Sequence, residues 1–193
     1  KRIYDAIYTG GITKRRGAMK ILEATKIAVK QEPGLKILFL GTYFPSELKD
    51  EMNDFLIANG LVNNVILHDP VPYSEVSGFY SRSKTGLGIF LPIPTHRIIL
   101  QIKIFEYMNY GLPIIGSNFG HIKNYIENNN SGITVNPENP EEIANALIML
   151  LKDRNLYDQL SKNGIKAVDE KYQWKFMEKK LISIYENLLN DQA

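Results

Sequence analysis

Lys-Ile-Phe-Glu-Tyr-Met-Asn-Tyr-Gly-Leu-Pro-Ile-Ile-Gly-Ser-Asn-Phe-Gly, residues 103–120, is the stretch that best predicts the fold of this chain. A basic residue, Lys103, and an acidic residue, Glu106, lie in the first turn of a short helical pattern. A Gly-Leu-Pro break, a short apolar strand and a glycine-containing loop follow. Ligands of open parallel sheets bind where the carboxyl ends of strands face helix N-termini. This stretch therefore predicts a ligand site at that edge of a parallel sheet.

Outward from this stretch, apolar runs alternate with helical patterns. Runs at residues 3–8, 35–40, 65–67, 87–91, 114–115 and 133–135 predict six strands, and their lack of polar alternation is typical of strands buried on both faces. Helical patterns are at 17–30, 46–59, 74–81, 139–151, 155–168 and 173–189. The order predicts one α/β domain over residues 1–193, a doubly wound parallel six-stranded Rossmann-like sheet with C-terminal helices.

Composition excludes several classes of function. The chain has 193 residues, 44% of them hydrophobic, and a net charge of +2, which is too small and too dispersed for a nucleic-acid partner. It has no cysteine, which excludes disulfides, zinc–thiolate sites and cysteine nucleophiles. Its histidines, His68, His96 and His121, lack the spacing of metal ligands, so we expect no metal site.

The ends of the chain and its apolar runs lead to expectations about location. No run approaches the roughly 20 apolar residues of a membrane span, and the first residues lack a secretory pattern. We therefore expect a soluble, cytoplasmic protein. Because the chain begins at Lys1 without a methionine and enters a strand almost at once, we expect a piece of a longer protein.

Three cations, Lys14, Arg15 and Arg16, come just before a helix that is predicted to begin near Gly17. Cations at a helix N-terminus oppose its macrodipole, at a cost of roughly 0.3–1 kcal/mol each when exposed. A bound phosphate would reverse that cost, so the cluster is a candidate phosphate site. The alternative is an ordinary solvated turn.

Lys103 and Glu106 form a second candidate at the start of another helix. A carboxylate beside helix-start amides can accept two vicinal ribose hydroxyls, while a lysine and the amides bind phosphates. One helical turn would then hold both parts of a nucleotide, and the glycines of residues 116–120 would let the backbone approach it. Alternatively, Glu106 only complements the helix dipole.

Other patterns predict packing rather than chemistry. Ser117 lacks the surroundings of a hydrolase nucleophile, and no strand is followed by a complete G-x-G-x-x-G. Trp174, Tyr185 and Leu188 recur at helical spacing near the C-terminus. We expect that stripe to pack in a core or against another helix.

Several short motifs spread over nearly the whole chain resemble one family. They are Tyr8-Thr9-Gly10-Gly11 with Arg16-Gly17, Phe39-Leu40-Gly41, Pro70-Val71-Pro72, Lys103-Ile-Phe-Glu106-Tyr107-Met108 with Gly111-Leu-Pro113, and Gly132-Ile-Thr-Val. On these residues the chain resembles the C-terminal, donor-nucleotide-binding domain of GT-B glycosyltransferases, in particular the retaining family 4 group. The block with Glu106 is the most specific of these motifs.

The resemblance implies a role for each matching residue. Arg16 would bind the diphosphate, the Val71 loop would hold the base through backbone groups, and Glu106 would bind the ribose hydroxyls. Lys103 and the backbone at Ile102 would face phosphate at the helix start. The remaining nucleotide-binding positions are the strand-end glycines Gly10, Gly11 and Gly41.

The resemblance also implies the reaction. Such enzymes transfer a sugar from a nucleotide diphosphate with retention of configuration, without a metal or other cofactor. Arg16, Lys103 and Glu106 are therefore the candidate catalytic residues, the two cations stabilising the leaving diphosphate.

Three positions depart from the family pattern. Ile98 occupies the place of the first carboxylate of a frequent Glu-x7-Glu pair, which would contact the donor sugar. Gly11 replaces a usual arginine, and Asn124 replaces a frequent acidic residue. The Lys-x-x-Glu-Tyr form resembles a branch of the family that lacks the first glutamate, so the departure at Ile98 is compatible with activity.

The resemblance further implies that half of the enzyme is absent from this chain. GT-B enzymes bind their acceptor with an N-terminal domain, here expected to take a saccharide or a lipid-linked saccharide. We therefore expect this fragment to bind donor but not to transfer sugar, with its tail from Gln173 directed to the absent domain and partly exposed. The full-length protein could associate peripherally with the inner face of the membrane. The alternatives are half of a nucleotide-sugar epimerase and a non-catalytic nucleotide-binding module.

Overall fold

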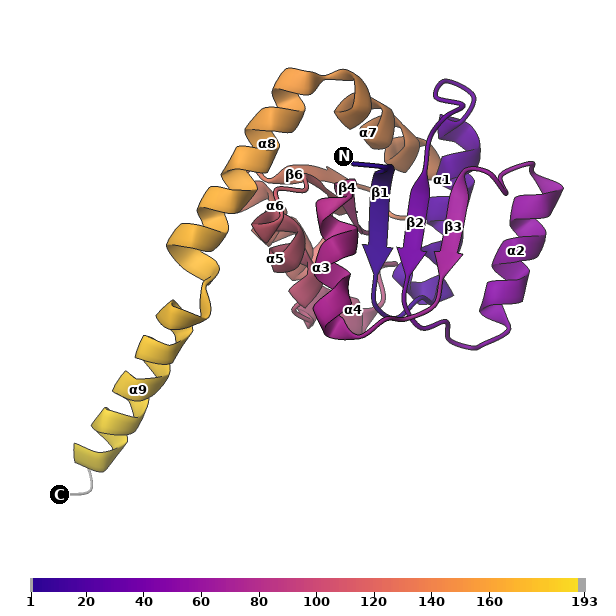
Figure 1. Cartoon of the computed structure of the whole chain (residues 1–193). Helices are drawn as coiled ribbons and strands as arrows, with labels where there is room; N and C mark the ends of the chain where they lie inside the picture. Colours follow the sequence, from indigo (N-terminus) through magenta and orange to yellow (C-terminus); the bar gives the residue numbers. More distant parts are fainter. Residues whose placement is uncertain (1, 191–193) are drawn as a thin grey trace.

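The computed structural model of the chain describes residues 2–190 and has one parallel sheet at its centre (Figure 1). The strands are β1 (Tyr4–Thr9), β2 (Ile37–Leu40), β3 (Val65–His68), β4 (Ser83–Gly88), β5 (Ile114–Ser117) and β6 (Gly132–Val135). They lie in the order β3-β2-β1-β4-β5-β6, and all neighbouring pairs are parallel. The predicted doubly wound six-stranded Rossmann-like sheet is confirmed.

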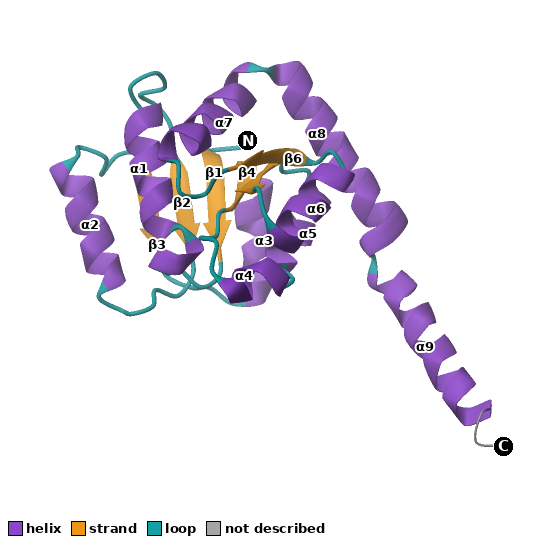
Figure 2. Cartoon of the chain, turned by 180° about the vertical axis from the view of Figure 1, so that it is seen from behind, coloured by secondary structure: helices purple, strands orange, loops and turns teal. Residues whose placement is uncertain are grey.

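Helices cover both faces of the sheet (Figure 2). They are α1 (Ala18–Ala28), α2 (Leu48–Ala58), α3 (Tyr73–Ser81), α4 (Pro94–Ile98), α5 (Ile102–Asn109), α6 (Gly120–Asn128), α7 (Pro140–Lys152), α8 (Arg154–Ala167) and α9 (Trp174–Asn190). A short 3-10 turn, Lys14–Arg16, precedes α1, and a π-helical turn, Val168–Tyr172, follows α8.

The buried apolar side chains form two cores, one on each face of the sheet, and successive residues of β1 pack into one and then the other. Ala6 and Tyr8 point to one face and pack with residues of α1, α2 and α7. Ile7 points to the other face and packs with residues of α3, α5 and α6. This alternation is the two-residue period of a strand, with apolar side chains on both faces because helices cover both.

The predicted limits of the fourth strand were wrong. The apolar run at residues 87–91 predicted a strand there, whereas β4 spans Ser83–Gly88. Its polar first residues are buried: the Ser83 hydroxyl donates to the Phe79 carbonyl over 2.8 Å, and Thr85 is 2% exposed. The chain has left the sheet by Leu91, whose amide donates to the Arg15 carbonyl over 2.9 Å.

The predicted packing of the Trp174, Tyr185 and Leu188 stripe was also wrong. These side chains are 69%, 61% and 54% exposed. After the π-helical turn the backbone becomes extended at Gln173, and α9 then projects away from the domain (Figures 1 and 2). The helical period was interpreted correctly, but no other element in residues 2–190 covers the apolar face. This exposure agrees with the separate expectation that the tail from Gln173 is partly exposed.

No helix among the described residues is both long enough and apolar enough to cross a bilayer.

Candidate functional site

Two adjoining hollows open at the carboxyl edge of the sheet. The first, of about 400 Å³, lies beyond the ends of β1 and β2, and the second, of about 530 Å³, lies between β1, α3 and the start of α5. Thr9, Gly10 and Val76 line both. All predicted nucleotide-binding residues line one or the other: Gly10, Gly11, Arg16, Gly41 and Val71 the first, and Ile102, Lys103 and Glu106 the second.

A close backbone contact forms the floor of the first hollow. A Cβ atom added at Gly41 would lie 1.8 Å from the carbonyl oxygen of Gly10, so only glycine fits there. The Gly10 amide also donates to the Leu40 carbonyl over 3.0 Å. The loops after β1 and β2 are thereby held against each other, which leaves their backbone exposed to the hollow.

Only one of the three clustered cations lines a hollow. The Lys14 ammonium lies 2.7 Å from the Glu51 carboxylate on the surface. The Arg16 guanidinium is directed to the first hollow, where Nη1 donates to the Gly11 carbonyl over 3.3 Å. Arg16 is the last residue of the 3-10 turn, and its amide donates to the Thr13 side chain over 3.0 Å. Its other donor nitrogens have no hydrogen bond among the described residues.

Lys103 lies at the wall of the second hollow with its side chain buried. Its Nζ has no hydrogen-bond partner in the described structure and lies 3.7 Å from the ring centroid of Tyr8. Burial holds the pKa of the ammonium well below its usual value, the nearby Arg16 lowers it further, and Glu106 raises it. A buried donor without an acceptor costs free energy, and an anion in the hollow would supply the acceptor.

Two tyrosines hold the carboxylate of Glu106. The Tyr73 hydroxyl donates to Oε1 and the Tyr80 hydroxyl to Oε2, each over 2.8 Å. Tyr73 is 78% exposed at the mouth of the hollow, and Tyr80 is buried. The hydrogen bond to Glu106 is the largest cause of a raised pKa at Tyr73, whereas burial is the largest cause of a raised pKa at Tyr80.

A hydroxyl network connects this carboxylate to the sheet. Thr9 Oγ1 lies 3.1 Å from the hydroxyls of both Tyr80 and Tyr107, and the Thr9 amide donates to the Tyr107 hydroxyl over 3.1 Å. Burial is the largest cause of the raised pKa of Tyr107. The last residue of β1 therefore fixes Tyr80, and Tyr80 fixes Glu106.

Some residues considered from the sequence lie away from the hollows. Ile98, at the end of α4, is 72% exposed and lines neither. The glycines of residues 116–120 also line neither. A Cβ at Gly116 would lie 2.2 Å from Ile126, and one at Gly120 would lie 2.7 Å from the Arg97 carbonyl. The absence of a side chain at these two positions serves internal packing in this structure.

The tyrosines on Glu106 were not predicted as site residues. Tyr73 and Tyr80 are seven residues apart on α3, and this spacing places them on one helix face. Helix α3 begins directly after the Val71 loop, so the spacing of the two tyrosines could have indicated that both lie near the site. Within residues 2–190, no group of three or more His, Cys, Asp or Glu side chains is arranged to hold a metal ion.

The model of the family described as glycosyl transferases group 1 matches residues 3–167. The chain belongs to this family. Two curated proteins are among those similar to this chain. A sucrose synthase of Melioribacter roseus is 34% identical over 146 residues, which is 70% of this chain and 18% of the synthase. The capsular polysaccharide biosynthesis glycosyltransferase CapM of Staphylococcus aureus is 25% identical over 184 residues, 95% of this chain and 46% of CapM.

Two solved structures have the same fold as this chain. The C-terminal domain of LpcC, a group 1 family protein of Francisella tularensis, aligns with a TM-score of 0.76 and 23% identity, covering 88% of this chain and 86% of that one. Anabaena HepE in complex with UDP and glucose aligns with a TM-score of 0.82 and 14% identity, covering 96% of this chain and 49% of HepE. This chain of a group 1 glycosyltransferase thus has the fold of a GT-B C-terminal domain, and it spans less than half the length of the two curated relatives above.

Proposed function

We propose that this chain is the donor-binding half of a retaining glycosyltransferase, which transfers a hexose from a nucleotide diphosphate sugar to a saccharide or lipid-linked acceptor. The observation that carries the proposal is the placement of Glu106, Lys103 and Arg16 around the Thr9–Gly10 end of β1. A carboxylate and two cations are the groups that a ribose and a diphosphate require. Family membership supports the reaction class, and the HepE complex with UDP and glucose supports the class of donor.

Each part of the nucleotide has a counterpart in the two hollows. The base would lie in the first, against the backbone at Val71, and the ribose hydroxyls would bind Glu106. The diphosphate would lie across the shared residues Thr9 and Gly10, between Arg16 and Lys103. Its negative charge would give the Lys103 ammonium the acceptor that it lacks.

The same cations would serve the chemical step. When the bond from the sugar to the diphosphate breaks, negative charge accumulates on the departing phosphate oxygens. Fixed positive groups in a low-dielectric hollow stabilise that charge without reorganising, and this is the usual basis of electrostatic catalysis. We infer that Arg16 and Lys103 fill this role in place of a metal ion.

The complete activity needs more than this chain. Because CapM is about twice as long as the segment it shares with this chain, we expect the acceptor to bind mainly to a second domain. The chain alone should bind donor and transfer no sugar, and turnover by the 193-residue protein with any acceptor would contradict this part of the proposal. For the full-length enzyme we propose a role in polysaccharide or glycoconjugate biosynthesis, with peripheral membrane association.

Calorimetric titration with UDP, GDP and ADP tests the site. At least one nucleotide should bind, and both Arg16→Ala and Glu106→Gln should weaken its binding by about tenfold or more, since each removes a charge-assisted contact. Arg82→Ala and Glu186→Gln are matched controls, because both side chains are exposed and far from the hollows. Absence of binding for all three nucleotides, or equal weakening by the controls, would refute the assignment.

A further inference from the structure

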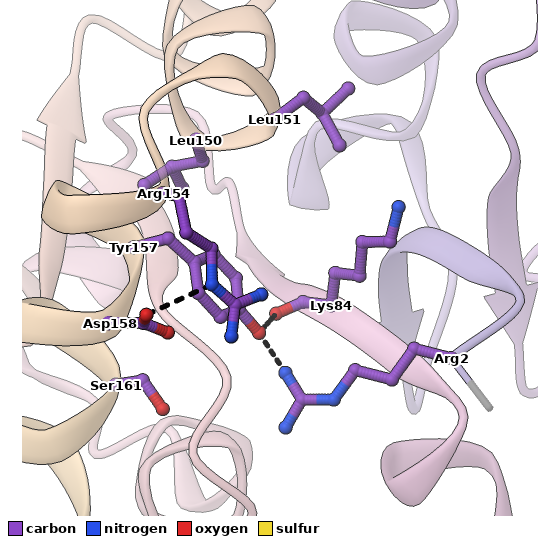
Figure 3. A pocket seen from close by; sticks show the side chains of 8 residues that line it. All are labelled: Arg2, Lys84, Leu150, Leu151, Arg154, Tyr157, Asp158 and Ser161. Carbon is purple, nitrogen blue, oxygen red and sulfur yellow. Dashed lines mark hydrogen bonds and ion pairs between the residues drawn. The ribbon is translucent and has the colours of Figure 1, made fainter.

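A further cavity, of about 520 Å³, lies at the opposite edge of the sheet, where the strands begin (Figure 3). Arg2 precedes β1, Lys84 belongs to the start of β4, and the end of α7 and first turns of α8 complete the walls. No residue of this cavity lines either donor-site hollow. Any ligand bound here would therefore be separate from the donor.

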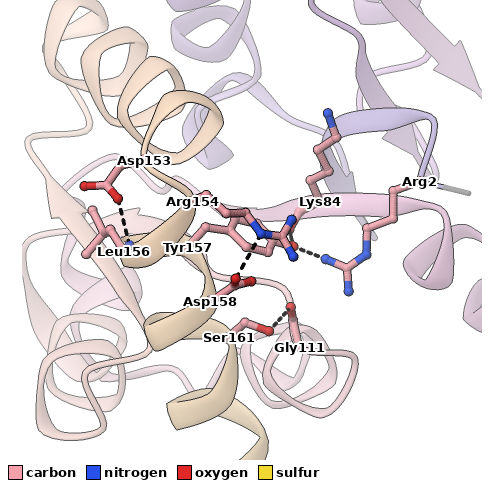
Figure 4. A network of polar contacts seen from close by, with 9 residues as sticks. All are labelled: Arg2, Lys84, Gly111, Asp153, Arg154, Leu156, Tyr157, Asp158 and Ser161. Atoms are coloured by element: carbon pink, nitrogen blue, oxygen red, sulfur yellow. Dashed lines mark hydrogen bonds and ion pairs between the residues drawn. The ribbon is translucent and has the colours of Figure 1, made fainter.

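Two arginines in this cavity flank the ring of one tyrosine. The guanidinium carbon of Arg2 lies 5.8 Å from the ring centroid of Tyr157, and that of Arg154 lies 5.4 Å from it. Arg2 Nη1 donates to the Tyr157 hydroxyl, which donates to the Lys84 carbonyl over 2.9 Å (Figure 4). In the close-up, the side chains of Arg154, from α8, and Arg2, from the segment before β1, both extend to Tyr157.

The carboxylates nearby neutralise only part of this charge. Asp158 accepts from Arg154 Nε over 2.9 Å, which leaves the terminal nitrogens of Arg154 free of any hydrogen bond among the described residues. Lys84 pairs with Asp5 over 2.8 Å. Arg2 has no carboxylate partner in residues 2–190. Burial and the charge of Arg154 both lower its pKa, and Asp158 raises it.

Placing the half-buried Arg2 and the exposed Arg154 beside the same ring brings two like charges together, and a bound anion would offset their repulsion. The terminal nitrogens of two guanidinium groups match the oxygens of a phosphate better than a single carboxylate does, because each planar group can donate two parallel hydrogen bonds. The cavity also has an apolar wall, formed by Leu150 and Leu151. Its volume is within the usual range for small-molecule sites.

We propose that this cavity binds a small organic phosphate ester, with its phosphate between Arg2 and Arg154 and its carbon portion against Leu150 and Leu151. Tyr157 is a positioning residue that orients the two guanidinium groups to the same ligand. The proposal concerns a site additional to the donor site and does not depend on the identity of the donor.

The test is an amide NMR titration of the protein with glycerol 3-phosphate, inorganic phosphate and glycerol. Glycerol 3-phosphate should shift the amides of Tyr157, Ser161 and Lys84, and should bind several-fold more tightly than inorganic phosphate. Glycerol should leave these amides unchanged. Arg154→Gln should weaken glycerol 3-phosphate binding by about tenfold, the loss expected for one charged contact. Arg82→Gln, an exposed arginine outside the cavity, should leave that binding unchanged.

The outcomes separate this site from the donor site. UDP should shift the amides of Gly10 and Gly41 instead, so binding at each site is detected through a different set of amide signals. The proposal is overturned if glycerol 3-phosphate at about 10 mM, which would reveal even a weak millimolar site, shifts none of the three cavity amides. Unchanged affinity in Arg154→Gln, or equal affinity for glycerol 3-phosphate and inorganic phosphate, would also overturn it. Arg154 is exposed at the surface, so this variant should fold normally.

Discussion

The Tyr73 hydroxyl donates a 2.8 Å hydrogen bond to Oε1 of Glu106, the carboxylate proposed to bind ribose. Oε2 accepts from the Tyr80 hydroxyl, so each oxygen of the carboxylate accepts one hydrogen bond from α3. Tyr80 is buried and tied to Thr9, whereas Tyr73 is mostly exposed and can leave. A ribose hydroxyl would therefore replace Tyr73 and keep Tyr80.

Tyr73→Phe should strengthen nucleotide binding by about two- to threefold. The substitution removes a hydrogen bond that must break on binding, and an exposed bond of this kind contributes at the low end of about 0.5–1.5 kcal/mol. Calorimetry with the nucleotide that binds best checks the change, and Tyr185→Phe on α9 is the control. Weaker binding by Tyr73→Phe would mean that this hydroxyl contacts the nucleotide itself.

Lys103→Met should stabilise the free protein and abolish tight nucleotide binding. The buried Nζ has no acceptor among residues 2–190, so an apolar side chain of similar length should raise the free energy of unfolding by about 1 kcal/mol. The contact of Nζ with the Tyr8 ring offsets some of that gain. Urea unfolding with and without nucleotide measures both effects, with the exposed Lys152→Met as control. A Lys103→Met protein less stable than the wild type would contradict the prediction.

Gly41→Ala should destabilise the fold strongly. Its Cβ would lie 1.8 Å from the Gly10 carbonyl, and relieving that clash must move the loops after β1 and β2 apart. We expect a loss of about 2–4 kcal/mol in the free energy of unfolding, together with weaker nucleotide binding. Gly34→Ala is the matched control, since nothing lies within 4 Å of a Cβ there. Similar unfolding midpoints for the two variants would contradict the prediction.

The domain should lose stability above about pH 10, the pKa of a tyrosine in an unfolded chain. Burial raises the pKa of Tyr8, Tyr80 and Tyr107, so the folded state keeps protons that the unfolded state releases. Their contribution is complete below the unfolded pKa and falls as pH rises, by up to about 1.4 kcal/mol per pH unit for each group. Urea midpoints on either side of pH 10 test this, and Tyr80→Phe should reduce the slope. A midpoint that stays constant up to about pH 11 would be incompatible with it.

The sequence pattern predicted correctly those strands that consist of a local apolar run and are covered by helices on both faces. β1 and β2 are such strands, and their glycine-terminated ends predicted where the hollows lie. β4 was misplaced because its first residues, Ser83 to Thr85, are polar. Ser83 and Thr85 are buried in part because they pair with the start of β1, which is far away along the chain, and no local pattern reveals this pairing.

The candidate site was predicted in its charged residues but not in the groups that orient them. Arg16, Lys103 and Glu106 can be recognised in the sequence because they lie at the starts of helices. A cation there opposes the helix dipole, which suggests a bound anion, and a carboxylate there is favourable. Tyr80 gains its position only when α3 packs beside α5, which is a tertiary contact. The same holds for the cavity at Arg2 and Arg154, whose residues come together from the beginning of the chain and from α8.

Helix α9 has 17 residues and an apolar face without a partner in the described structure. Isolated helices shorter than about 12–15 residues are only marginally stable in water, and α9 is only slightly longer than that limit, so its stability without a partner should be low. Its helicity would then be a reporter of assembly. Circular dichroism of the chain alone, compared with the chain bound to a partner that covers this face, would then detect that contact as a gain in helical signal.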